Sequence, residues 1–97
     1  MDYNNLTGSK GVVLVEFFAT WCPHCRRMSP IVEQIKELLA GKAEVVQLDI
    51  DQNAQAADAA QVQSVPTFLL YSDGKLLWRQ SGEMDAEALL AKVESAL

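Results

Sequence analysis

The feature that most constrains the fold is an apolar run at residues 12–18, VVLVEFF, which only Glu16 interrupts. A continuous run of this length predicts a central strand that is buried on both faces of a sheet. A helical pattern follows, because apolar residues recur at spacings of three and four: Met28, Ile31, Val32, Ile35, Leu38 and Leu39. Gly41 is expected to end this helix, and Pro30 inside it is expected to introduce a kink.

The rest of the chain predicts further strands and helices. Three apolar stretches are expected to be strands, at 44–50, 65–71 and 75–81. A turn at 72–74 makes the last two strands a hairpin. The alanine-rich segment 51–61 predicts a short helix with Asp51 or Asn53 as its cap, and a final helix is expected from the N-cap Asp85 to the end of the chain.

These elements predict a fold class. Their order is strand, helix, strand, helix, strand, strand, helix, with a helical turn near Tyr3 ahead of the first strand. Strands separated by helices predict a parallel βαβ unit, and the closing hairpin adds antiparallel strands. We therefore expect an α/β fold, a three-layer α/β/α sandwich with a central four-stranded mixed sheet. The 97 residues suit a single domain spanning 1–97.

Composition excludes several classes of protein. The net charge of −5 argues against a nucleic-acid-binding protein, which normally has a basic face. Residues 1–11 contain no apolar run, so we expect neither a signal peptide nor a membrane anchor. No apolar stretch is long enough to span a bilayer, so no membrane partner is expected. These features predict a cytoplasmic monomer, or a periplasmic one if a leader precedes Met1.

The motif WCPHC, residues 21–25, contains the chain's two cysteines and its single histidine. A Cys-x-x-Cys can be half of a metal site, a structural staple or a catalytic dithiol. A disulfide that closes so short a loop removes little entropy from the unfolded state, which disfavours a staple. A structural zinc site usually takes four ligands, and one histidine between the cysteines does not complete it. We therefore expect no metal, and a catalytic dithiol is favoured.

The place of the motif, between strand 12–18 and the long helix, predicts different roles for the two cysteines. Cys22 is expected to be the N-cap and Pro23 the first helical residue, which puts Cys25 at the third helical position. Helix N–H groups and the helix dipole then lower the pKa of Cys22 and make it the nucleophile. Residues three apart on a helix bring their Cβ atoms to roughly 5–6 Å. A modest adjustment then closes a disulfide.

Longer stretches around the motif resemble the thioredoxin family. The resemblance runs from about Val12 to Leu97 and rests on four segments: FFATWCPHCRRMSP, QLDIDQN, SVPTFLLYSDGK and SGEMD. It implies a thioredoxin-like sandwich that works without an organic cofactor. Cys22 would attack a substrate disulfide, and the less exposed Cys25 would resolve the mixed disulfide. The family's amino-terminal strand is missing from the predicted order, and Phe18 replaces a tryptophan of the family.

The resemblance also implies a substrate groove beside the cysteines. Pro66 matches the family's cis-proline, and the alternative is a proline at a strand edge. The backbone of Val65 would pair with an extended segment of the substrate, in the manner of strand addition. The residues expected to line or rim this groove are Trp21, Pro23, Val65, Pro66 and the loop Ser81–Gly82–Glu83.

Glu16 is the one acid inside the apolar strand. A buried acid is costly unless it is neutral or paired, and burial raises its pKa. The resemblance places Glu16 where the family usually has a buried aspartate, and Gln47 where a lysine often neighbours that acid. It implies that Glu16 takes the proton of Cys25 during resolution. The alternative is a glutamate that reaches solvent from the end of the strand.

His24 bears on whether the chain resembles the reducing or the oxidising members of the family. Reducing thioredoxins typically have Gly-Pro between the cysteines, whereas Pro-His resembles the periplasmic thiol oxidases. A protonated His24, with Arg26 and Arg27 nearby, would stabilise the Cys22 thiolate and make the disulfide more oxidising. The alternatives are a solvated histidine without a partner and two arginines on a solvated face.

Together these observations predict a thiol–disulfide oxidoreductase that exchanges protein disulfides through the pair Cys22 and Cys25. We expect a thioredoxin-like reductase with a more oxidising potential than usual, which receives electrons from a reductase or another redox partner. One alternative is an oxidase-like disulfide donor. The other is a binding module of the same fold whose cysteines are idle.

Overall fold

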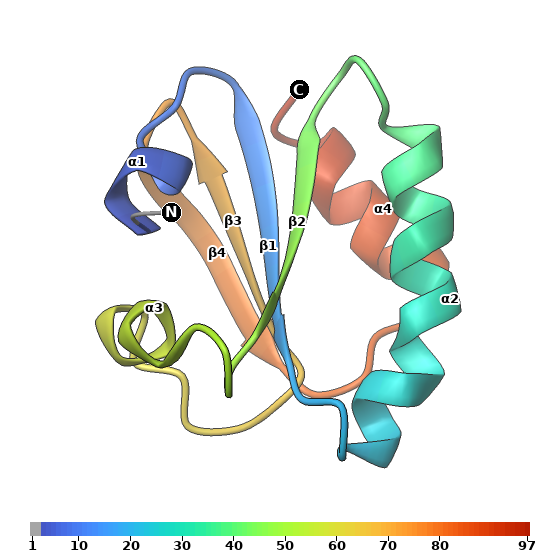
Figure 1. Cartoon of the computed structure of the whole chain (residues 1–97). Helices are drawn as coiled ribbons and strands as arrows, with labels where there is room; N and C mark the ends of the chain where they lie inside the picture. Colours follow the sequence, from blue (N-terminus) through green and yellow to red (C-terminus); the bar gives the residue numbers. More distant parts are fainter. Residues whose placement is uncertain (1–2) are drawn as a thin grey trace.

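The computed structural model describes residues 3–97 (Figure 1). Its elements in chain order are α1 (Tyr3–Thr7), β1 (Val12–Phe18), α2 (Pro23–Leu38), β2 (Glu44–Asp49), α3 (Ala54–Ala59), β3 (Thr67–Ser72), β4 (Lys75–Ser81) and α4 (Ala86–Glu94). The predicted order is confirmed, including the helical turn near Tyr3. The predicted domain of 1–97 also contains Met1 and Asp2, which lie outside the described residues.

Strand β1 is an inner strand of the sheet, as its apolar run predicts. The four strands are arranged in the order β2-β1-β3-β4. β1 pairs in parallel with β2 and antiparallel with β3, and β3 pairs antiparallel with β4. This is the four-stranded mixed sheet expected from the sequence. Within residues 3–97 the helix α1 precedes β1, so β2 forms one edge of the sheet.

Side chains alternate along β1 and therefore contribute to two cores on opposite faces of the sheet. Leu14 packs with Val32 of α2 and Leu89 of α4 on one face. Phe17 packs with Leu6 of α1 and with α3 on the other. Figure 1 shows the same arrangement, with α2 and α4 covering one face and α1 and α3 covering the other. The three-layer sandwich is confirmed.

Strand β3 begins two residues later than predicted, at Thr67 rather than Val65. Pro66 explains the difference, because it has no N–H to offer to a neighbouring strand. The Val65–Pro66 peptide bond is cis, as the resemblance implies. The first two residues of the predicted strand are therefore a loop, and this loop lies beside the cysteines.

The helix predicted at 51–61 is also shorter, because Asp49 ends β2 with a turn. The backbone N–H groups of Gln52 and Asn53 both donate to the carbonyl of Asp49. Asn53 is the N-cap of α3, but its side-chain amide donates to the Asp49 carbonyl instead of accepting a helix N–H. Asp85, the predicted cap of α4, likewise makes no side-chain cap bond, and α4 ends at Glu94 rather than at the end of the chain.

Helix α2 carries the cysteine motif at its start. It remains α-helical from Pro23 to Leu38 with Pro30 inside it, and Gly41 follows in the left-handed region at φ +81°. The stop predicted at Gly41 is therefore off by two to three residues. None of the helices in residues 3–97 is long and apolar enough to cross a bilayer.

The hairpin offers a test of the core assignment. Leu70 of β3 is 1% exposed, whereas Leu77 of β4 is 48% exposed. Leu70→Ala should lower the free energy of unfolding by about 2–5 kcal/mol, because it opens a cavity between the sheet and its helices. Leu77→Ala is the matched control and should change it by less than about 0.5 kcal/mol. Urea unfolding measures both values, and equal losses would contradict this packing.

Candidate active site

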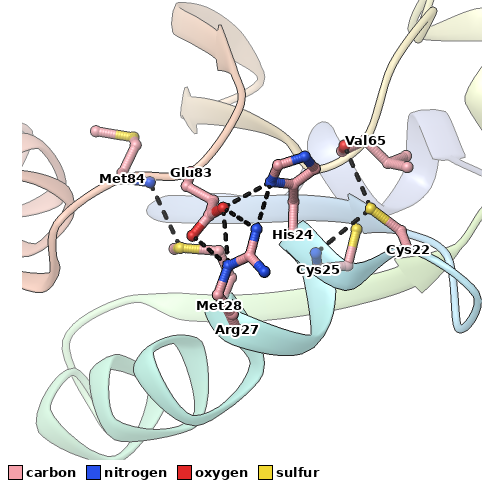
Figure 2. A network of polar contacts seen from close by, with 8 residues as sticks. All are labelled: Cys22, His24, Cys25, Arg27, Met28, Val65, Glu83 and Met84. Carbon is pink, nitrogen blue, oxygen red and sulfur yellow. Dashed lines mark hydrogen bonds and ion pairs between the residues drawn. The ribbon is translucent and has the colours of Figure 1, made fainter.

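The nucleophile is positioned by the turn between β1 and α2. The backbone N–H of Cys22 donates to the carbonyl of Ala19 at 3.2 Å, which closes this turn. Cys22 is the N-cap of α2 and Pro23 is its first residue, as predicted. The Cys22 Sγ accepts the backbone N–H of Cys25 at 3.4 Å (Figure 2). A sulfur held at a helix start in this way is an acceptor for helix N–H groups.

The pKa of Cys22 is lowered, although burial acts in the opposite direction. Burial alone would raise the pKa of this thiol, but the Cys25 thiol, the backbone N–H groups of Cys25 and His24, and the charge of Arg26 together outweigh it. Each of these groups favours the thiolate because each directs positive charge or a hydrogen toward the sulfur. The site therefore favours a nucleophilic sulfur at Cys22.

The pKa of Cys25 is shifted in the opposite direction. Burial first, and then the nearby Cys22 and Glu16, raise the pKa of Cys25 to about 12. Each cysteine is 4% exposed, so the expected difference in exposure does not show in their accessible areas. The two cysteines differ because burial, Cys22 and Glu16 together disfavour the Cys25 thiolate, whereas at Cys22 the helix N–H groups and Arg26 outweigh burial.

Glu16 is buried, at 1% exposure, which excludes the alternative of a solvated side chain. Its Oε1 accepts a hydrogen bond from Nε2 of Gln47 at 3.2 Å, and its Oε2 has no hydrogen-bond partner among the described residues. Burial raises the pKa of Glu16 to about 7, and the Gln47 hydrogen bond opposes this only in part. The acid is thus poised to gain or lose a proton near neutral pH.

The loop before β3 forms one wall of a hollow next to the cysteines. The Cys22 Sγ lies 3.6 Å from the carbonyl of Val65, to which the thiol can donate. A cavity of about 360 Å³ opens here, and its lining is mostly apolar: Trp21, Cys22, Pro23, His24, Ile50, Val62, Gln63, Ser64 and Val65. A larger hollow of about 720 Å³ beside α3 is lined by no thiol and lies away from this chemistry.

His24 points to the loop after β4. Its Nδ1 lies 2.6 Å from Oε2 of Glu83, and Arg27 contacts the same carboxylate through Nη2 at 2.7 Å and through Nε (Figure 2). The interpretation of His24 as a histidine without a partner is therefore wrong. Arg27 lies on a solvated face, with its side chain 57% exposed, and it pairs there with Glu83. The predicted rim residue Glu83 lies beside the motif through these contacts.

Two further contacts extend the site beyond the predicted residues. The indole of Trp21, 62% exposed, donates from Nε1 to Oδ2 of Asp51 at 3.0 Å. Gly82 donates its backbone N–H to the carbonyl of Pro66 at 2.8 Å, which joins the two predicted rim loops. No sequence pattern pairs Asp51 with Trp21, since 30 residues separate them. For the contacts among His24, Arg27 and Glu83, one signal is present in the sequence, the opposite charges of Arg27 and Glu83.

Within residues 3–97, no three histidine, cysteine or acidic side chains gather as a metal site would need. What the arrangement offers is thiol chemistry. A sulfur with a lowered pKa and a thiol with a raised pKa lie one helical turn apart, next to an open hollow. Such a pair, on a mixed sheet with a cis-proline loop beside it, defines a domain of the thiol–disulfide oxidoreductase class.

Comparison with known proteins gives the family. The family model described as Thioredoxin matches residues 2–95, and the chain belongs to the thioredoxin family. Thioredoxin from Bacillus subtilis is 35% identical over 92% of this chain and 86% of its own length. The structure of a variant thioredoxin from Halobacterium salinarum superposes with a TM-score of 0.86 at 35% identity, over 96% of this chain and 80% of that one.

Some relatives are much longer than this chain. The chloroplastic thioredoxin Y of rice is 38% identical over 95% of this chain. The chain spans only 55% of the length of that relative.

The buried acid generates a pH-dependent prediction. The pKa of Glu16 is about 7 in the folded protein and 4.5 in the unfolded chain, so unfolding becomes easier as pH rises through this window. This difference in pKa lowers the free energy of unfolding by about 3 kcal/mol. The loss is absent below pH 4.5 and complete above pH 7. Glu16→Gln cannot titrate at this position and should escape the loss.

Urea unfolding of both proteins at pH 5 and pH 8 measures the effect. Glu16→Gln should be more stable than the parent at pH 8 by more than it is at pH 5. All other titrating groups are shared, so they cancel in the comparison. Parallel pH profiles for the two proteins would show that Glu16 does not carry the raised pKa.

Proposed function

We propose that this protein is a thiol–disulfide oxidoreductase that reduces protein disulfides through Cys22 and Cys25. One observation carries the proposal. The Cys22 Sγ accepts the backbone N–H of Cys25, while burial and nearby charge raise the pKa of the Cys25 thiol to about 12. One sulfur is thus prepared to attack, and its neighbour stays protonated until the attack has occurred.

The first step is attack of the Cys22 thiolate on one sulfur of a substrate disulfide. A bond forms between Cys22 and that sulfur, the substrate S–S bond breaks, and the other substrate sulfur leaves as a thiolate that takes a proton from water. The mixed disulfide no longer has a negative charge on Cys22. One of the causes that raise the pKa of Cys25 is thereby removed.

In the second step Cys25 loses its proton and attacks Cys22. We assign the proton to the carboxylate of Glu16, whose pKa is about 7 and whose Oε2 has no partner among the described residues. The bond between Cys25 and Cys22 forms as the bond from Cys22 to the substrate breaks. The second substrate sulfur leaves as a thiolate, and the substrate has gained two electrons.

The substrate would lie in the hollow beside Val65. The lining of this hollow is mostly apolar, which suits an extended segment of a protein substrate rather than a small charged thiol. In this proposal the backbone of Val65 pairs with the segment, with Trp21, Pro23, Pro66 and the loop at Gly82 and Glu83 around it. A reductase or another redox partner would return the disulfide to the dithiol, and a cytoplasmic location of a monomer fits that cycle.

A second direction of transfer has its own support. The lowered pKa of Cys22 reflects stabilisation of the reduced form, and this makes a disulfide a better oxidant. Protonated His24 would add to this stabilisation. An oxidase-like disulfide donor is therefore the second candidate, and we propose that the protein is a reductase with a potential more oxidising than usual.

The roles of the cysteines can be tested by trapping. Cys25→Ser should leave Cys22 able to attack and unable to be resolved, so substrate proteins should accumulate as mixed disulfides. Cys22→Ser should trap none, because Cys25 stays protonated at neutral pH. Non-reducing gels of a lysate incubated with each variant give the readout. Equal trapping by both variants would contradict the assignment of the nucleophile.

The proposed activity itself is tested with insulin, whose reduction produces turbidity. The parent protein with dithiothreitol should accelerate the reaction well above dithiothreitol alone, and Cys22→Ser should not. A parent that leaves turbidity at the uncatalysed rate would instead indicate a binding module with idle cysteines.

The reduction potential separates the two directions. Equilibration in glutathione buffers should place the Cys22–Cys25 pair above thioredoxin's value of about −270 mV and well below the value of about −120 mV of a strong oxidant. A value near −120 mV would favour the oxidase-like donor. A value at or below −270 mV would show that the Pro-His pair does not make this disulfide more oxidising.

A further inference from the structure

The loop after β4 contacts α2 through the carboxylate of Glu83 and through the backbone N–H of Met84, which donates to Sδ of Met28 at 3.4 Å (Figure 2). Glu83 receives a hydrogen bond from Nη2 of Arg27 at 2.7 Å and from its Nε at 3.1 Å, and the Nδ1 of His24 lies 2.6 Å away. In the chain, Glu83 is 56 residues from Arg27 and 59 residues from His24. His24 and Arg27, two of the groups that can carry positive charge next to Cys22, thus share one anion.

The geometry assigns the proton within this cluster. The Nδ1 of His24 also lies 2.8 Å from Nη2 of Arg27, and one nitrogen cannot both donate to a carboxylate and accept from a guanidinium. The shorter contact is the one to Glu83, and a carboxylate can only accept. His24 therefore carries its proton on Nδ1 and donates it to Glu83. Arg27 and His24 hold the pKa of Glu83 down, at about 2, so the carboxylate is charged at neutral pH.

Both partners of Glu83, His24 and Arg27, lie close to the nucleophile Cys22. His24 lies two residues after Cys22 and lines the same hollow. Glu83, and to a smaller extent Cys22, raise the pKa of Arg27 above its ordinary value, so Arg27 interacts with both. The negative charge of Glu83 offsets the positive charge that Arg27 would otherwise direct at the sulfur.

We infer that Glu83 is a positioning residue that keeps the reduction potential of the Cys22–Cys25 pair low by binding His24 and Arg27. The inference rests on the proposed function, and it gives the loop after β4 an electrostatic role in place of a purely steric one. Without Glu83, the guanidinium of Arg27 loses the anion that offsets its charge and is free to approach Cys22. This change stabilises the thiolate.

The equilibrium on which Glu83 acts can be written in full. The Cys22–Cys25 disulfide and two glutathione thiols give the Cys22 thiolate, the Cys25 thiol, one glutathione disulfide and one proton. Two electrons pass from the glutathione sulfurs to the cysteine pair. Among the protein groups, only the Cys22 thiolate gains a charge in this reaction. Cations freed near the sulfur therefore shift the equilibrium toward the reduced protein.

Glu83→Gln tests the inference with little change in side-chain shape. The Cys22 pKa, followed by the ultraviolet absorbance of the thiolate, should fall. The equilibrium constant for reduction by glutathione should rise by roughly threefold, the size expected for one screened surface charge. Threefold corresponds to an increase of about 14 mV in the reduction potential. Glu94→Gln, at the far end of α4, removes one negative charge away from the site and should leave both values unchanged.

The double variant His24→Gln/Arg27→Gln distinguishes an action through the two side chains that Glu83 binds from a direct action of Glu83 on Cys22. In that background, Glu83→Gln should change the potential much less than it does in the parent. A full shift in that background would contradict the assigned route. An unchanged Cys22 pKa and potential in Glu83→Gln alone, with only the melting temperature altered, would show that Glu83 merely anchors the loop.

Both readouts concern the cysteine pair itself and need no protein substrate. A failure of insulin reduction would therefore count against the proposed function and leave the test of Glu83 intact. If Glu83→Gln perturbs the loop, Glu83→Ser provides a second removal of the same charge. An opposite shift, toward a lower potential in both variants, would overturn the inference.

Discussion

The burial of β1 on both faces is the constraint on which the rest of the structure depends. β1 pairs with β2 on one edge and with β3 on the other, and its alternating side chains enter both cores. Because the strand is held on four sides, the turn that follows it has a defined start. Cys22 therefore lies at the N-cap of α2, where its sulfur accepts the backbone N–H of Cys25.

The same burial creates the proton chemistry of the site. Glu16 shares the face of β1 that α2 covers, where desolvation raises its pKa to about 7 and where its charge contributes to the raised pKa of Cys25. The helix start has the opposite effect on Cys22. Two thiols of one residue type, equally exposed at 4%, thus differ in protonation. Burial, Cys22 and Glu16 disfavour the Cys25 thiolate, whereas helix N–H groups and Arg26 outweigh burial at Cys22.

Local sequence pattern predicted the type and order of the elements, but it did not predict contacts between residues far apart in the chain. The apolar run of β1 and the cysteine spacing within α2 were sufficient to predict the sandwich and the N-cap. The resemblance was needed for the cis bond before Pro66, because nothing in the local pattern separates it from a proline at a strand edge. Element ends were predicted less well, as at Thr67, because they depend on which backbone groups find partners.

The sequence by itself determined the class of chemistry, because a helix start supplies N–H groups to a cysteine at the N-cap whatever the rest of the chain does. It also determined that Glu16 would be a costly acid, since an apolar run on both sides of it predicts burial. Only the tertiary structure decided what surrounds those groups. Glu83 reaches His24 and Arg27 from a loop more than 50 residues away, and its charge changes what they can do for the sulfur. Electrostatic effects depend on distance in space, and residue spacing along the chain does not report that distance.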